Sequence, residues 1–396
     1  MTDEFIKIRG GKLVESIENE MLRIIRQGIS AQEHQGLRPL REIFQNSDDE
    51  ISDRVFIHID ENNIEFLNDG NCLTAVLEKG ELVGGSCRHI LGINMASKKH
   101  NPDSAGEFGT GLRSAHAISH FIEVHAEATE AGKKTKMEYV GKTNAYDKNL
   151  IEYSTDRFRF KVRKNDERPE RTVISRHCLL ENRTGIMIRL PWRKKVYPGG
   201  IEQNVRDWET YLWNKERITE LYHQYVKEIP RILLGCSWIR EVVLDFELDN
   251  EKKRTAWIRD FNHREFEYNE KEVIRNNVKL SKYSSHSTGL MDGLTVDIKK
   301  LKKVDSQTFT IFSYTNPEIK HLAEEARHLA PCHILMPDIP QEKMPAYTPI
   351  ALTGNCGNYF APISFLPPDE TRTIIKIEGV NADRQIWAAN AIKSIT

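Results

Sequence analysis

The chain has 396 residues, of which 39% are hydrophobic and 29% are charged, and its net charge at pH 7 is −1. This composition is typical of a globular protein and argues against a disordered chain, while the length exceeds what one hydrophobic core usually organises. The balanced charge argues against a strongly basic nucleic-acid-binding protein. The charged start lacks an apolar secretory segment, and no later window holds the roughly 18 apolar residues of a membrane span. We therefore expect a cytoplasmic protein.

Two amphipathic helices and a hairpin are predicted near the start of the chain. Apolar residues recur at helical spacing over 12–28, where Gly28 stands at a C-cap position, and again over 37–50. β-branched and aromatic runs at 55–60 and 63–67 flank turn-prone residues, a pattern that predicts a β-hairpin. A sheet is therefore expected to follow the helices.

The middle of the first half combines a loop with further strands. Residues 79–105 are rich in Gly, Ser, Lys and His and lack a clear period, so we expect a mobile loop that serves as a lid. A short helix is expected over 112–118. Strands are expected near 120–128, 136–140, 150–163 and 186–190. Helices followed by mostly antiparallel strands predict an α+β sandwich.

A change of pattern near 193–206 predicts a boundary, because basic residues and a Pro-Gly-Gly sequence interrupt the strands there. We expect two domains, 1–195 and 206–396. In the second, a helix over 207–227 is expected to lead through Pro230 into strands. These strands are expected near 238–248, 254–260, 308–313, 332–336 and 372–378.

The helix predicted over 37–50 carries Glu42 and Asn46 four residues apart, which places them on one face. A carboxylate in this position can orient or deprotonate a water, and an amide oxygen one turn away can ligate Mg²⁺. Asp49, almost one turn further on, can add to such a site through water. Taken alone, the pattern also fits a solvated helix face, which is the commoner arrangement.

A glycine-spaced segment, Gly106 to Leu112, runs directly into the next predicted helix. Backbone amides bared by glycine at a helix N-terminus bind polyphosphate oxygens. The segment lacks the Gly-Lys-Ser/Thr ending of a P-loop, and no strand with dinucleotide-binding spacing precedes it. A glycine-rich turn without a ligand explains this segment equally well when it is considered alone.

The two motifs together resemble a known superfamily. Leu40–Asp49 resembles the first box of the ninety-kilodalton heat-shock chaperones, whose helix carries a catalytic Glu and a Mg²⁺-binding Asn. The glycine segment resembles the lid-hinge box of the gyrase, heat-shock chaperone, histidine kinase and MutL (GHKL) superfamily, and Ile90–Gly92 with Lys98 is similar to the sacsin-like lid. The resemblance covers about residues 12–192. It implies the Bergerat fold, a two-layer α/β sandwich with a mixed, mostly antiparallel sheet, followed by a second α/β transducer-like domain.

By this resemblance Glu42 is the water-activating base and Asn46 the Mg²⁺ ligand of an ATP site, with ATP and Mg²⁺ as the cofactors. Basic residues of the second domain, Arg372, Lys376 or Arg384, are candidates to reach the γ-phosphate. The further residues expected to bind the nucleotide are Asp49, Asn68, Asp69, Gly70, Lys98, Gly106, Phe108, Gly109, Thr110, Gly111, Leu112 and Thr184.

The sequence departs from the superfamily pattern at two places. Asn68 stands where the adenine-reading Asp is usual, and Cys72 where a second glycine is usual. An Asn oxygen can accept the adenine amino proton, but the bond lacks the strength that a charged acceptor gives, and Asp69 takes the role if the strand end is shifted by one residue. Thr184 precedes Gly185, the reverse of the family order, so a strand-entry turn is an alternative role for it.

The resemblance implies Mg²⁺-dependent ATP binding and slow hydrolysis that drives lid closure and a conformational clamp. One alternative is a nucleotide-sensing switch with little hydrolysis, and another is a scaffold that uses the fold only for protein contacts. Sacsin-like ATPases of prokaryotes occur as chaperone-like proteins and in defence against phage. We accordingly expect a protein partner or client and consider a homodimer compatible with the sequence, whereas neither a membrane nor a nucleic-acid partner is indicated.

Overall fold

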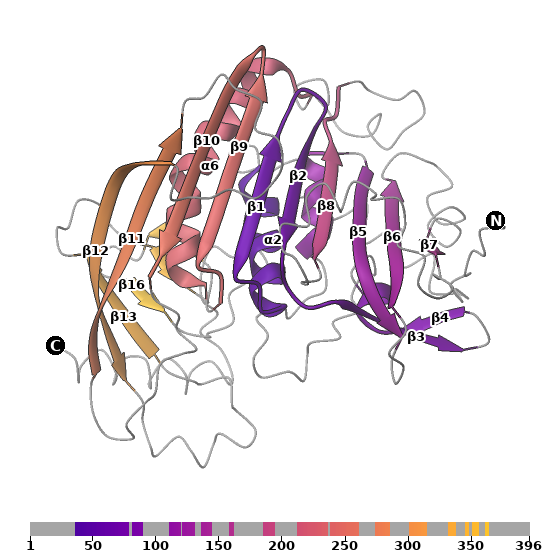
Figure 1. Cartoon of the computed structure of the whole chain (residues 1–396), viewed down its shortest axis with the longest axis horizontal. Coiled ribbons are helices and arrows are strands. Elements are labelled where there is room, and N and C mark those ends of the chain that lie inside the picture. Colours follow the sequence, from indigo (N-terminus) through magenta and orange to yellow (C-terminus); the bar gives the residue numbers. More distant parts are fainter. Residues whose placement is uncertain are drawn as a thin grey trace.

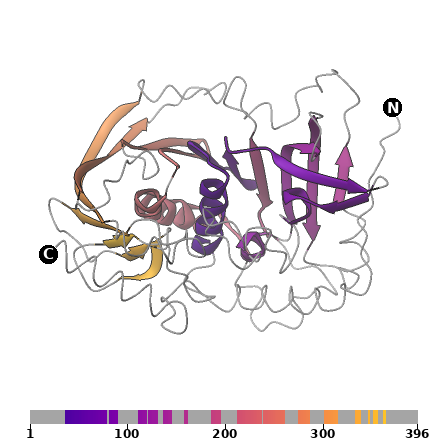
Figure 2. The same cartoon turned by 90° about the horizontal axis from the view of Figure 1, so that it is seen from below.

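The computed structural model of the chain consists of one long, curved sheet with helices packed on one of its faces (Figures 1 and 2). This is an α+β arrangement with a mixed, mostly antiparallel sheet. The structure describes residues 36–78, 81–89, 111–119, 121–130, 136–144, 158–161, 185–194, 212–236, 238–260, 274–285, 301–314, 332–337, 345–347, 351–355 and 361–363.

Helix α2, Leu37–Asp49, confirms the helix predicted over 37–50. Its apolar stripe is buried, with Leu40, Ile43 and Phe44 at most 1% exposed. Burial of three such side chains contributes about 1.5–3 kcal/mol each, which is enough to hold a helix that has no side-chain N-cap. The stripe fixes which face of α2 remains for polar groups.

The hairpin predicted after this helix is confirmed as β1, Arg54–Ile59, and β2, Asn63–Asn68, which pair antiparallel. Asp60 fixes the turn, because its Oδ1 accepts hydrogen bonds from the backbone N–H groups of Asn62 and Asn63 at 2.6 and 2.8 Å. Such an Asx arrangement is the usual role of Asp in a tight turn.

The sheet extends from β2 through strands of the first half of the chain. β2 pairs with β8, β8 with β5, and β5 lies parallel to β3, while β6 pairs with β5 and β7 with β6. The predicted strands at 120–128, 136–140 and 186–190 are confirmed. The bounds are β3 Leu73–Glu78, β4 Glu81–Gly84, β5 Phe121–Glu130, β6 Lys136–Asn144, β7 Phe158–Lys161 and β8 Ile186–Pro191.

On its other side, β1 lies parallel to β9, so strands of the second half of the chain continue the same sheet. From β9 the order is β10, β11, β12, β13, β16, β14 and β15, and this end of the sheet curls until β15 contacts helix α6 (Figure 2). The bounds are β9 Glu241–Leu248, β10 Glu251–Arg259, β11 Ile274–Ser285, β12 Lys302–Tyr314, β13 Cys332–Pro337, β14 Pro345–Tyr347, β15 Ala351–Asn355 and β16 Ala361–Ile363.

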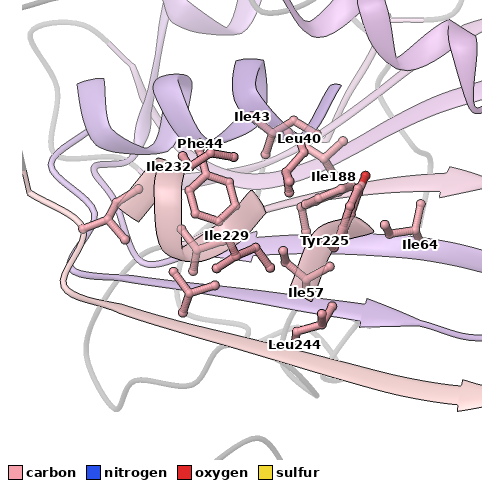
Figure 3. Close-up of a cluster of buried hydrophobic side chains, with 14 of the residues drawn as sticks. Leu40, Ile43, Phe44, Ile57, Ile64, Ile188, Tyr225, Ile229, Ile232 and Leu244 are labelled. Atoms are coloured by element: carbon pink, nitrogen blue, oxygen red, sulfur yellow. The ribbon is translucent and has the colours of Figure 1, made fainter. Parts of the chain in front are cut away.

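Helix α6, Lys215–Gly235, lies beside α2 on the sheet (Figure 2). Tyr225 and Ile229 of α6 pack with Phe44 of α2 and Ile57 of β1 in one hydrophobic cluster (Figure 3). The described parts of the two predicted domains, 1–195 and 206–396, therefore share a sheet and a core. The division itself stays a prediction.

Helix α6 differs from the helix predicted over 207–227. It begins after Asn214, whose side chain accepts a hydrogen bond from the Arg217 N–H at 3.0 Å, and it continues through Pro230. A proline inside a helix removes one backbone hydrogen bond and usually ends the helix. Here the residues beyond it, Ile232 and Leu233, are fully buried, so packing outweighs the local preference.

The lid expected over 79–105 is structured where the chain is described. β4 pairs antiparallel with β3, and α3, Ser86–His89, follows. Gly85 turns the chain with a φ of +86°, and the Ser86 Oγ accepts a hydrogen bond from the Thr74 N–H at 2.7 Å. The loop prediction is therefore wrong for this part, because local pairing to β3 orders it. The rest of that segment lies outside the described residues, as do the helix predicted over 12–28 and the strand predicted near 372–378.

The sheet face opposite the helices carries a row of charged residues at paired positions. His58 stands between Glu65 of β2 and Asp245 of β9. Arg189 Nε contacts Glu65 Oε1 at 2.6 Å, and Arg254 pairs with Asp245. Charges therefore alternate along this row when His58 is protonated, which stabilises neighbouring strands.

None of the helices in the described residues is both long and apolar enough to cross a membrane.

Candidate functional site

Glu42, Asn46 and Asp49 lie on one side of α2, because residues three and four apart share a helix face. Glu42 is buried at 6% exposure, whereas Asn46 and Asp49 are half-buried. A carboxylate, an amide oxygen and a second carboxylate are hard oxygen ligands of the kind that Mg²⁺ prefers. The helix thus supplies the groups that the sequence predicted, on the face that the hydrophobic stripe leaves available.

The 3₁₀ helix η2, Gly111–Ala117, packs directly against α2. It corresponds to the helix predicted over 112–118, and its Leu112 is buried. The 3₁₀ helix that begins at Gly111 therefore lies against the helix that carries Glu42 and Asn46. The other predicted phosphate-binding and lid residues, Lys98, Gly106, Phe108, Gly109, Thr110 and Thr184, lie outside the described residues, as do Arg372, Lys376 and Arg384.

The far end of η2 is held by two contacts that the sequence did not reveal. Arg193, which is 1% exposed, donates a hydrogen bond from Nη1 to the carbonyl oxygen of Ala117 at 3.1 Å. Ser119 donates from Oγ to the carbonyl oxygen of Pro191 at 2.5 Å. In the sequence, Arg193 looks like part of a basic linker, but in the structure it anchors η2 to the end of β8.

Asn68 is bound within the protein through both ends of its amide. Its Nδ2 donates to Ser47 Oγ at 3.1 Å, and its Oδ1 accepts from Ser52 Oγ at 3.2 Å and from the Gly70 N–H at 3.1 Å. An amide oxygen has two lone pairs, and both are used here. To accept an adenine amino proton, Asn68 must give up one of these bonds. In this structure it ties the end of β2 to α2.

Asp69 has a comparable role at the start of β1. Its Oδ1 accepts hydrogen bonds from the backbone N–H groups of Asp53 and Arg54 at 2.8 and 2.9 Å. The Asn71 N–H donates to the carbonyl oxygen of Glu50 at 2.8 Å, so the turn after β2 lies close under the end of α2. A Cβ on Gly70 would meet that carbonyl oxygen at 2.8 Å, which explains glycine at this position.

Asp48, on the side of α2 that faces α6, was not singled out by the sequence. Its carboxylate is buried, and Oδ1 accepts hydrogen bonds from the N–H groups of Trp238 and Ile239 at 2.6 and 3.1 Å. Arg259 holds the same connection between α6 and β9 by donating to the carbonyl oxygens of Cys236 and Ile239. Burial lowers the pKa of Arg259, and the nearby carboxylate of Asp48 opposes this shift. The end of α2 is thereby joined to the second half of the chain.

No protein-family model and no curated protein matches the sequence. The assignment of a function therefore depends on the residues and their geometry.

Proposed function

We propose that the chain binds Mg²⁺-ATP beside α2 and hydrolyses it slowly, as a member of the GHKL superfamily in its chaperone- and sacsin-like branch. The observation that supports the proposal is the packing of η2, which begins at Gly111, against the helix that carries Glu42 and Asn46. The helix that follows the glycine segment thereby lies against the helix with Glu42 and Asn46, as a shared site would require.

The residues present fit this cofactor. Magnesium commonly keeps several waters and binds through one or two protein oxygens plus substrate phosphates, so it does not need an all-protein cage. Among the described residues no group of three or more His, Cys, Asp or Glu could hold a metal, so magnesium here would need phosphate oxygens and waters as further ligands. Asn46 supplies an amide oxygen, and Asp49 can reach the site through water.

In the proposed mechanism, Glu42 orients a water for in-line attack on the terminal phosphate and accepts its proton on a carboxylate oxygen. Bound magnesium supplies electrostatic stabilisation of the charge on the phosphates. Backbone amides of the segment that ends at Gly111 would hold the phosphate oxygens at the start of η2. Glu42 itself is buried, which keeps its carboxylate out of bulk solvent.

The test replaces the proposed base. Glu42→Ala should retain ATP binding, measured by isothermal titration with MgCl₂, and lose phosphate release by about 10²- to 10⁴-fold, the usual contribution of a general base. Glu220→Ala, an exposed glutamate of α6, is the matched control and should behave as wild type. Undiminished turnover in Glu42→Ala would remove Glu42 from the mechanism.

The Asn68 contacts favour a second candidate, a nucleotide-sensing switch that binds ATP with little hydrolysis. Both lone pairs of the Asn68 oxygen are used inside the protein, so adenine recognition through this residue requires a rearrangement. Steady-state phosphate release at saturating ATP separates the two candidates. Binding without measurable release would favour the switch, whereas no binding at millimolar ATP would exclude both and favour a scaffold.

A further inference from the structure

The side chain of Gln45 on α2 has no structural explanation within the fold. It is 1% exposed, and among the residues that the structure describes, neither its amide nitrogen nor its carbonyl oxygen has a hydrogen-bond partner. Leaving a buried polar group unpaired costs about 1–3 kcal/mol, and the large majority of such groups in folded proteins are paired. A buried carboxamide with both ends unpaired is therefore expected to find a partner when the protein works.

The position of Gln45 indicates where that partner lies. It follows Glu42 by three residues and precedes Asp49 by four, and its other helix neighbours, Arg41 and Asp48, bond to α6 and to the connection before β9. Helix periodicity therefore places Gln45 at the border between these two sides of α2. Two residues further along α2, Ser47 bonds to Asn68 at the end of β2. The following residue, Asp48, bonds to the connection before β9. Gln45 thus borders the proposed catalytic side of the helix.

We infer that Gln45 is a further ligand-contacting residue of the proposed ATP site, on its phosphate and metal side. The inference rests on the proposed function. The amide nitrogen donates to a phosphate oxygen, and the carbonyl oxygen accepts from a water of the hydrated Mg²⁺.

A hydrated magnesium polyphosphate matches both ends of the carboxamide. A carboxamide offers two N–H donors and one acceptor oxygen, while the ligand offers anionic oxygens and metal-bound waters that donate. The adenine end is expected elsewhere, because Asn68 reaches α2 through Ser47, which lies on a different side of the helix from Gln45. Gln45 is therefore assigned to the phosphate end of the nucleotide.

The experiment uses Gln45→Met, which nearly preserves side-chain length and volume and removes both hydrogen-bonding groups. Wild type, Gln45→Met and the matched control Gln224→Met, a half-buried glutamine of α6, are titrated with ATP in MgCl₂ and melted without ligand. Gln45→Met should bind about tenfold to hundredfold more weakly, the loss expected for a hydrogen bond to a charged group. Its melting temperature without ligand should be equal to or above that of wild type, because an unpaired buried group is removed. Gln224→Met should keep the wild-type affinity.

A purely structural glutamine gives the opposite pair of results. Wild-type affinity in Gln45→Met, or a melting temperature several degrees lower without ligand, overturns the inference. The variant Asn46→Ala distinguishes failure of the Gln45 inference from failure of the proposed function. If Asn46→Ala loses affinity and Gln45→Met does not, the inference alone fails, whereas absence of ATP binding by the wild type overturns both.

Discussion

Replacing Asp48 should destabilise the protein more than replacing any exposed acid, because its buried carboxylate joins α2 to the connection between α6 and β9. It is 4% exposed and accepts two backbone hydrogen bonds, from Trp238 and Ile239. Hydrogen bonds to charged groups contribute about 1.5–3 kcal/mol each, so Asp48→Ala, which leaves two N–H groups unpaired, should cost about 3–5 kcal/mol. This is a large part of a typical free energy of unfolding of about 5–15 kcal/mol.

Urea unfolding followed by circular dichroism measures this cost. Asp48→Asn keeps an acceptor oxygen and should lose only about 1–2 kcal/mol, so the two variants should differ. Asp249→Asn is the matched control, since Asp249 pairs with Lys215 in an exposed ion pair and its replacement should leave the unfolding midpoint unchanged. If Asp48→Ala lowered the free energy of unfolding by less than about 1 kcal/mol, the proposed stabilising role of this carboxylate between α2 and the second half of the chain would be refuted.

Three further predictions concern the sheet and the turn after β2. Burial lowers the pKa of His58, but the hydrogen bond to Asp60 and nearby carboxylates raise it above its ordinary value of 6.5. Protonated His58 therefore stabilises the folded protein fully below pH 6.5, and this stabilisation is lost as the pH rises through the raised pKa. Between about pH 5 and 8, the melting temperature of wild type should fall more steeply than that of His58→Gln. Asn68→Asp removes the donor to Ser47 and adds a charged acceptor, so it should melt at a lower temperature yet prefer ATP over GTP more strongly in competition titrations. Gly70→Ala should cost about 1–3 kcal/mol in urea unfolding, because its Cβ meets backbone at 2.8 Å, whereas Gly84→Ala, with an ordinary contact at 3.4 Å, should not.

Local patterns were sufficient to predict the elements nearest the candidate site. The stripe of Leu40, Ile43 and Phe44 predicted α2 to within a residue, and the β-branched runs predicted the hairpin of β1 and β2. The hairpin pairing of β1 with β2 is local in sequence, and the apolar stripe of α2 marks the face that distant segments later cover, so the pattern and the packing agree. The placement of Glu42 and Asn46 on one face follows from the same helix.

Contacts between distant segments account for what the sequence could not predict. The passage of α6 through Pro230 depends on buried residues beyond it, and the parallel pairing of β1 with β9 joins segments separated by almost two hundred residues. The roles of Gln45 and Asp48 also escaped prediction. Acids and amides on a helix usually face solvent, and only the packing of other segments against α2 buries these two.

The parallel pairing of β1 with β9 also restricts how the two halves of the chain can move relative to each other. The paired residues run from Arg54 opposite Glu241 to Ile59 opposite Phe246. A rigid rotation of one half of the chain relative to the other about 193–206 would break this row of backbone hydrogen bonds. A movement that begins at α2 and reaches the second half of the chain would therefore have to deform the sheet that both halves share.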